Sequence, residues 1–107
     1  MAVELNETEL SDAELVRRIG TESDREAEAE LFRRVAPRIR LYGLRHLRNQ
    51  AAAEDLTQQV LITTLETLRQ GRLREPEKLA SFVLGTCRMT VLDLRRGANP
   101  QSLRRSE

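Results

Sequence analysis

The chain has 107 residues, of which 33% are charged, and its 18 basic side chains almost balance its 17 acidic ones. This length allows one domain with a modest core, and the formal net charge of +1 by itself indicates no particular partner. The single cysteine excludes an internal disulfide and any zinc site built from several cysteines, and no stretch approaches the roughly twenty apolar residues of a membrane-spanning helix.

The charges are unevenly distributed along the chain. Acidic residues are concentrated before Glu30, and the rest of the chain is rich in arginine, with Lys78 as the only lysine. This asymmetry admits nucleic acid as a partner, although arginine is also a good helix former on solvated faces. The N-terminal "MAVELNETEL" is acidic with no apolar run behind it, so it is not a signal peptide, and we expect a cytoplasmic protein.

The first elements are a lead-in and a short helix. Residues 1–10 are expected to form a flexible lead-in, and no stretch of the chain has the alternation of a β-strand. Ser11 and Glu14 have the spacing of a capping box, which predicts a helix start. Gly20 is expected to end this helix.

A second and longer helix is predicted from a capping box at Ser23 and Glu26 to about Arg48. Pro37 lies inside it and should bend or locally break the helix, because proline removes one backbone donor. The apolar stripe of this helix repeats at steps of four and consists of Ala27, Leu31, Val35 and Ile39.

Asn49 is placed to cap a third helix, and Gly71 to end it. The fold class is therefore all-α, and we expect a compact bundle of three main helices plus the short N-terminal one. The apolar stripe of the third helix consists of Leu56, Val60, Leu61, Thr64, Leu65 and Leu68.

A loop at residues 72–79 separates this helix from a fourth, which has Pro76 in its first turn and stops at Gly97 and Pro100. Residues 11–97 make up the predicted helical domain, and residues 98–107 have the composition of a linker or tail. The fourth helix has an apolar stripe of Leu79, Val83, Cys87, Val91 and Leu94, which makes Cys87 a core residue.

The chain carries no pattern typical of catalysis or of a metal site. Glu54 and Asp55 are adjacent, so on a helix they point about 100° apart and cannot act as a facing acid/base pair. The offsets at which a helical metal site would carry a carboxylate or histidine hold Gln58 and Gln59 instead. His46, the only histidine, is a helix-end residue rather than a ligand. We therefore expect no enzyme, no metal and no cofactor.

A polar row on the third helix suits binding to a protein better. Asp55 and Gln59 share one face of the predicted helix, and Gln58 adjoins it. Such a row can hydrogen-bond a basic partner helix at an interface that must later come apart. The alternative is an ordinary solvated helix face, and spacing alone favours this plainer interpretation.

Three segments of the chain resemble the motifs of one known protein family. Residues 53–60 read Ala-Glu-Asp-Leu-Thr-Gln-Gln-Val, where the family has Ala-Glu-Asp-Leu-x-Gln-Glu-Val. Residues 82–89 read Phe-Val-Leu-Gly-Thr-Cys-Arg-Met, where it has Trp-Leu-x-x-Ile-Ala-Arg-Asn, and Asp-Leu-Arg-Arg follows at 93–96. The segment "ELFRRVAPRIRLYGLRHL" is similar to the family's first long helix, its proline included. Together these segments resemble region 2 of the bacterial sigma-70 family, with the extracytoplasmic function (ECF) sigma factors as the closest branch, and the resemblance covers residues 11–97.

The resemblance implies a transcription initiation factor domain. One face would bind the clamp helices of the β′ subunit of core RNA polymerase, and another would capture the non-template single strand of the promoter −10 element. The expected polymerase-binding residues are Glu54, Asp55, Gln58, Gln59 and Thr63.

The DNA-binding surface implied by the resemblance combines the loop, which would hold a flipped −10 base, with the fourth helix. For Leu79 and Phe82 the alternative is plain core packing, and for Asp93 we expect a salt bridge with a nearby arginine. The expected DNA-binding residues are Arg72, Leu73, Arg74, Lys78, Leu79, Phe82, Arg88, Arg95 and Arg96.

The chain departs from the family pattern at three positions, which weakens the expected DNA contacts more than the fold. Gln59 replaces a glutamate, Phe82 a tryptophan and Met89 an asparagine. The resemblance also implies a C-terminal helix-turn-helix domain, which we expect to be missing because residues 98–107 correspond to the family's interdomain linker. Two other readings stay open: a helical module bound by an anti-sigma factor with its DNA activity lost, and a stand-alone DNA-binding regulator. We expect a monomer when the domain is alone.

Overall fold

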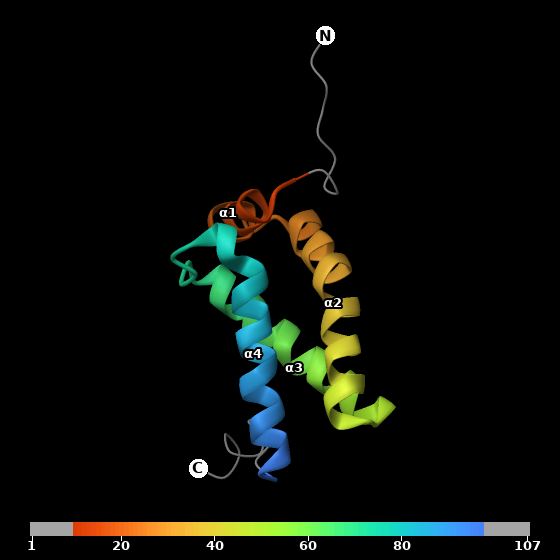
Figure 1. Cartoon of the computed structure of the whole chain (residues 1–107). Helices are drawn as coiled ribbons and strands as arrows, with labels where there is room; N and C mark the ends of the chain where they lie inside the picture. The colour runs from red at the N-terminus through yellow and green to blue at the C-terminus, as the bar shows by residue number, and fades with distance from the viewer. Residues whose placement is uncertain (1–9, 98–107) are drawn as a thin grey trace.

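The computed structural model describes residues 10–97, and the regular structure of this part of the chain is entirely helical, as predicted (Figure 1). The expected lead-in and tail lie outside the described residues, except for Leu10, which is buried in the core. The elements are α1 (Asp12–Glu22), α2 (Arg25–Leu47), α3 (Gln50–Arg69), the short 3₁₀-helix η2 (Pro76–Lys78) and α4 (Leu79–Arg95).

The helices form a small bundle around α3. Figure 1 shows α2 and α4 side by side, with α3 crossing behind them and α1 lying across one end. The apolar stripes predicted from helical spacing meet in the middle, since one stripe on each amphipathic helix must be removed from water. The largest fully buried side chains include Leu15, Ile19, Leu31, Ile39, Leu56, Leu68 and Leu79.

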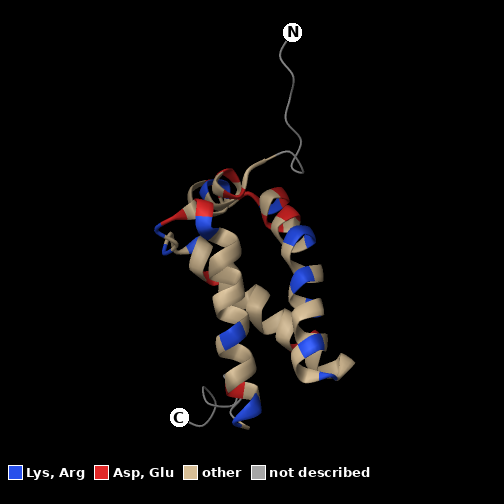
Figure 2. Cartoon of the chain, viewed as in Figure 1, with Lys and Arg blue, Asp and Glu red and all other residues tan. Residues whose placement is uncertain are grey.

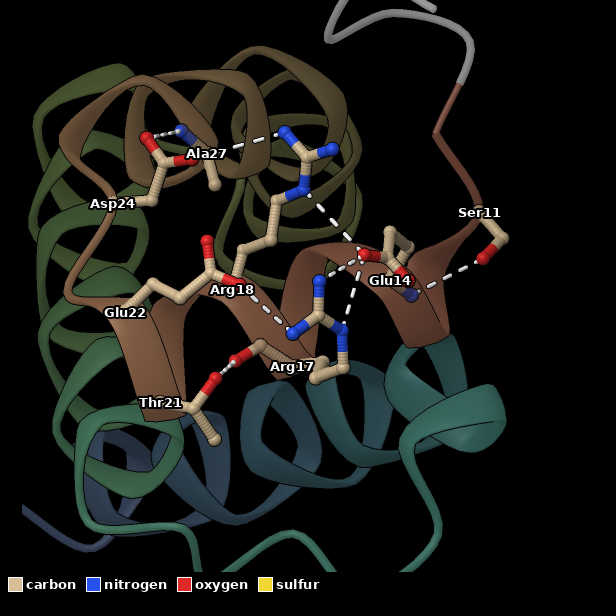
Figure 3. A network of polar contacts seen from close by, with 8 residues as sticks. All are labelled: Ser11, Glu14, Arg17, Arg18, Thr21, Glu22, Asp24 and Ala27. Carbon is tan, nitrogen blue, oxygen red and sulfur yellow. Dashed lines mark hydrogen bonds and ion pairs between the residues drawn. The ribbon is translucent and has the colours of Figure 1, made fainter.

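The first helix begins as predicted but ends later. The Ser11 hydroxyl accepts a hydrogen bond from the Glu14 amide at 3.1 Å (Figure 3). The Glu14 carboxylate binds Arg17 and Arg18 rather than returning to the cap, so only half of the box forms. The predicted stop at Gly20 is wrong: α1 continues to Glu22.

Gly20 lies at a close contact between α1 and α3 and does not end α1. A β-carbon added at Gly20 would lie 3.0 Å from the carbonyl oxygen of Leu68 on α3. The residue thus allows α1 to approach α3 closely, and the helix ends at Ser23, which has a φ of 50° in the left-handed region.

The start of α2 is displaced by one residue from the prediction. Asp24, not Ser23, is the N-cap, and its carboxylate accepts hydrogen bonds from the amides of Glu26 and Ala27 at 3.0 and 3.3 Å. The expected local break at Pro37 is also absent, since α2 runs without interruption from Arg25 to Leu47.

The ends of α3 agree with the sequence. The Asn49 side chain accepts a hydrogen bond from the Ala52 amide at 2.8 Å, and Gly71, with a φ of 65°, follows the last turn. Pro76 opens η2, which leads directly into α4. Between α3 and η2, the segment from Gly71 to Glu75 forms a short exposed connection beside α1.

Candidate functional site

The outward side of α3 carries part of the predicted protein-binding row. Asp55, Gln58 and Thr63 are all exposed, and Ile62 lies among them with 46% of its surface accessible. Because α3 packs against both α2 and α4, this side faces away from both helices. Ile62 was missed by the sequence analysis, although its position seven residues after Asp55 places it on the same side of the helix.

Two of the five residues expected to bind polymerase, Glu54 and Gln59, are ion-paired or half-buried. The Glu54 carboxylate forms an ion pair with Arg40 across the α2–α3 contact. Gln59 is half-buried, and its Oε1 is buried without a hydrogen-bond partner among the described residues. The solvent-facing row is therefore made by Asp55 and Gln58, with Gln59 at its inner edge.

The connection before α4 presents the predicted loop cations to solvent. Arg72, Arg74 and Lys78 are all exposed. Arg72 donates a hydrogen bond to the Gln70 side chain at 3.2 Å, and Lys78 pairs with Glu75 at 3.2 Å. These contacts lie at the surface, where an ion pair contributes little to stability and can be exchanged for a ligand.

The apolar residues expected in the base pocket lie closer to the core. Leu79 is only 1% exposed. Leu73 and Phe82 are half-buried and pack against the same core cluster. The geometry therefore leaves only parts of Leu73 and Phe82 accessible beside the loop cations.

The predicted arginines of the fourth helix are exposed along the second half of α4 and directly after its last residue. Arg88 and Arg96 point to solvent, and Arg95 donates a hydrogen bond to the backbone carbonyl of His46 on α2 at 2.8 Å. Asp93 is half-buried, and the salt bridge expected for it is not formed within residues 10–97. Arg95 thus ties the far ends of α2 and α4 together.

A cavity of about 600 Å³ lies between α2 and α4. The sequence analysis did not find it, because its two walls come from segments that are more than thirty-five residues apart. The residues that line it are Asp12, Arg34, Val35, Arg38, Ile39, Tyr42, Leu79, Ala80, Val83, Leu84 and Cys87.

Cys87 forms part of the cavity wall and is buried, as its place in the apolar stripe predicted. Burial raises the pKa of its thiol to about 11, because the charged thiolate loses its hydration. Within residues 10–97, no group of three or more His, Cys, Asp or Glu residues is arranged to hold a metal ion. None of the helices in this part of the chain is long and apolar enough to cross a membrane.

Comparison with known proteins assigns the fold to a family. A family model for sigma-70 region 2 matches residues 31–100, which is more than half of the chain. No curated protein and no solved structure matches the chain. The match indicates a sigma factor role in transcription initiation, in which region 2 in general interacts with core RNA polymerase and promoter DNA. On this match and on its all-α fold, the chain belongs to the sigma-70 region 2 family.

Proposed function

We propose that this chain is the region 2 domain of an ECF-type sigma factor, and that it acts by binding rather than by catalysis. The outward side of α3 docks on the clamp helices of the β′ subunit. The loop and the start of α4 capture a base of the non-template strand of the −10 element. The domain acts in the cytoplasm.

The observation that carries the docking proposal is the pair Asp55 and Gln58 beside Ile62. Both polar side chains are exposed and make no hydrogen bond or ion pair within residues 10–97, so they are available to a partner. Ile62, at 46% exposure, offers an apolar contact at the centre of the same side. A small apolar centre with polar surroundings is the usual composition of a separable protein interface.

The DNA proposal is supported by exposed cations next to a partly accessible apolar surface. Arg72 and Arg74 lie in the connection with the half-buried Leu73, and Lys78 and the half-buried Phe82 lie at the end of η2 and in the first turn of α4. Removing a base from its stack costs a few kcal/mol, which contacts with apolar and cationic side chains can offset. Arg88, Arg95 and Arg96 add phosphate contacts that are independent of sequence.

The docking proposal is tested by calorimetric titration of the domain with a β′ clamp-helix fragment. We expect micromolar or tighter binding by the native sequence, and at least a tenfold loss in an Asp55→Ala, Gln58→Ala double variant. The control is Glu66→Ala, Gln70→Ala, which removes one carboxylate and one amide at the other end of the same exposed side and should bind within about twofold. A folded native domain that does not bind the fragment overturns the docking assignment.

The DNA proposal is tested with a fluorescent −10 oligonucleotide at several salt concentrations. We expect Arg72→Ala, Arg74→Ala to weaken binding and to reduce the slope of log affinity against log salt by about 0.7 per lost phosphate contact. Arg25→Ala, Arg48→Ala removes two exposed arginines outside the loop and should leave the slope unchanged. An equal change in both double variants would contradict a loop-centred DNA site.

A second candidate is a protein-binding module held by an anti-sigma factor, with its DNA activity lost. It is favoured by the exposed apolar surface of α4, where Leu84, Met89 and Leu92 are 40%, 60% and 41% accessible. Intact polymerase binding together with no oligonucleotide binding at low salt would select this candidate over the first.

A further inference from the structure

The cavity between α2 and α4 is an open groove with aliphatic walls. One wall comes from residues 34–42 of α2 and the other from residues 79–87 of α4, each about nine residues or 13 Å long. Val35, Ile39 and Val83 line the deep part. Leu84 is 40% exposed on the α4 edge, so apolar surface there stays in contact with water.

Both edges of the groove are positively charged. Arg38 lines the groove on the α2 side, and Arg88 lies on α4 one helical turn after Leu84, just beyond the lining residues. Neither forms an ion pair with a carboxylate of residues 10–97. Arg95, seven residues after Arg88, reaches across to His46, which shows that this side of α4 faces α2.

Few acidic groups offset these arginines. The chain has no acidic residue between Glu30 and Glu54, and α4 carries only Asp93. Figure 2 shows arginine bands along α2 and a further band on α4, whereas the acidic residues lie mostly around α1, the first turn of α2 and the connection before α4, with one more near the end of α4. Asp12, at one end of the groove, is already paired with Arg34 at 3.2 Å.

The walls suit a protein helix better than a strand of nucleic acid. Single-stranded nucleic acid is held by a positively charged groove combined with several aromatic rings on which successive bases stack. The groove has one aromatic residue, Tyr42, and its ring already lies 4.1 Å from the ring of His46. Aliphatic walls with charged edges are instead the features that accept an amphipathic helix.

We propose that the α2–α4 groove binds an amphipathic helix of a partner protein, with two to three turns of aliphatic residues flanked on both sides by Asp or Glu. The aliphatic stripe packs on Ile39, Val83 and Leu84, and the flanking carboxylates pair with Arg38 and Arg88. The occupant lies on the side of the domain opposite the exposed row of α3.

The proposed helix would also cover Arg88, one of the arginines assigned to phosphate contacts. Binding in the groove therefore competes with DNA while leaving the α3 side free. This regulatory consequence rests on the proposed function, whereas docking in the groove does not depend on it.

The test uses Tyr42 as a built-in reporter, because the chain has one tyrosine and no tryptophan. The probe is an 18-residue peptide of Leu, Ala and Glu, with Leu on one helical face and Glu on both flanks. We expect a saturable change in Tyr42 fluorescence. Arg38→Glu should weaken binding at least tenfold and Leu84→Ser several-fold.

The matched control is Arg25→Glu, which makes the same change of charge on the same helix outside the groove and should alter binding less than twofold. A peptide with Lys in place of Glu should bind Arg38→Glu more tightly than the native domain. Neither Arg38 nor Leu84 is among the residues assigned to polymerase or DNA, so failure here is separable from failure of those assignments.

Three outcomes would overturn the proposal. The native domain could fail to respond to the acidic peptide, or a peptide of the same composition without an apolar face could bind equally well. The third is a Tyr42 response to oligothymidine that Arg38→Glu abolishes while the acidic peptide gives none, which would make the groove a nucleic-acid site.

Discussion

Helix α2 has two neighbours and meets them in opposite ways. Against α3 it packs so closely that a β-carbon added at Gly43 would lie 2.9 Å from the Cα of Ala53. Against α4 it leaves a cavity of about 600 Å³. Small residues at the first contact allow the two backbones to approach, whereas the second contact is flanked by Arg38 and Arg88, neither of which has a carboxylate partner within residues 10–97. The difference separates a contact that holds the fold from a surface that is open to ligands.

The largest effect is expected from Gly43→Ala. The added methyl group would overlap the backbone of Ala53 and the side chain of Leu56, which lies 3.0 Å from the built β-carbon. Overpacking of this kind costs about 1–3 kcal/mol, and it should outweigh the gain of about 1 kcal/mol in helix propensity. We expect urea denaturation to show a net loss of about 1–2 kcal/mol.

The control for that loss is Gly85→Ala on α4, where no atom lies within 4 Å of the built β-carbon. Here the gain in helix propensity is unopposed, so stability should rise by about 0.5–1 kcal/mol. A stabilised Gly43→Ala protein would mean that the α2–α3 contact is looser than its geometry indicates.

Thr64→Val is expected to raise the free energy of unfolding by about 1 kcal/mol, whereas Gly43→Ala lowers it. Thr64 is fully buried on α3, and its hydroxyl has no hydrogen-bond partner among the described residues. Replacing an unsatisfied buried hydroxyl with a methyl group of similar size removes a desolvation penalty. The midpoint of urea denaturation should therefore rise.

The matched variant is Thr57→Val on the same helix. Thr57 is also buried, but its hydroxyl donates to the carbonyl of Ala53 at 2.8 Å. Losing this bond should lower stability or leave it unchanged. Equal effects of the two substitutions would show that the hydroxyl of Thr64 is satisfied in solution.

Much of the fold could be predicted from helical spacing and caps, because these signals act within a few residues. Asn49 caps α3, and the stripe from Leu79 to Val91 is buried. The errors were also local. Ser23 and Asp24 both carry an oxygen that can cap a helix, and Asp24 is the one that caps α2. Gly20 was predicted to end α1, but it allows α1 to pack closely on α3.

Less of the candidate sites than of the fold could be predicted from the sequence. Spacing placed Asp55 and Gln58 on one exposed side, but it could not show that Arg40 pairs with Glu54 or that Gln59 turns partly inward. The groove was missed entirely, because Arg38 and Leu84 come together only once α2 and α4 have packed on α3. Contacts between distant segments carry no local pattern.

An effect confined to alkaline pH is expected at the Cys87 thiol on the groove wall. Its pKa is raised to about 11 in the fold, whereas an unfolded cysteine ionises near 8.5. The thiol therefore stabilises the fold fully below about pH 8.5, and this contribution is lost as pH rises toward 11. Relative to Cys87→Ala, which lacks this titration, the advantage of the native protein in urea should shrink between pH 8 and pH 10. A constant difference would mean that water reaches the thiol.

The smallest effect on stability, and the sharpest contrast with Gly43, is expected from Ala80→Leu. Ala80 is exposed and lines the groove, so a larger side chain can extend into open space instead of into a neighbouring backbone. Leucine is also nearly as good a helix former as alanine. Stability should change by less than about 0.5 kcal/mol, as for other surface substitutions. The new side chain would nevertheless fill part of the space that the acidic helix needs, so affinity for the acidic peptide should fall several-fold while oligonucleotide binding stays the same. Added bulk beside α4 would thus alter binding alone, whereas a single methyl group between α2 and α3 alters the fold.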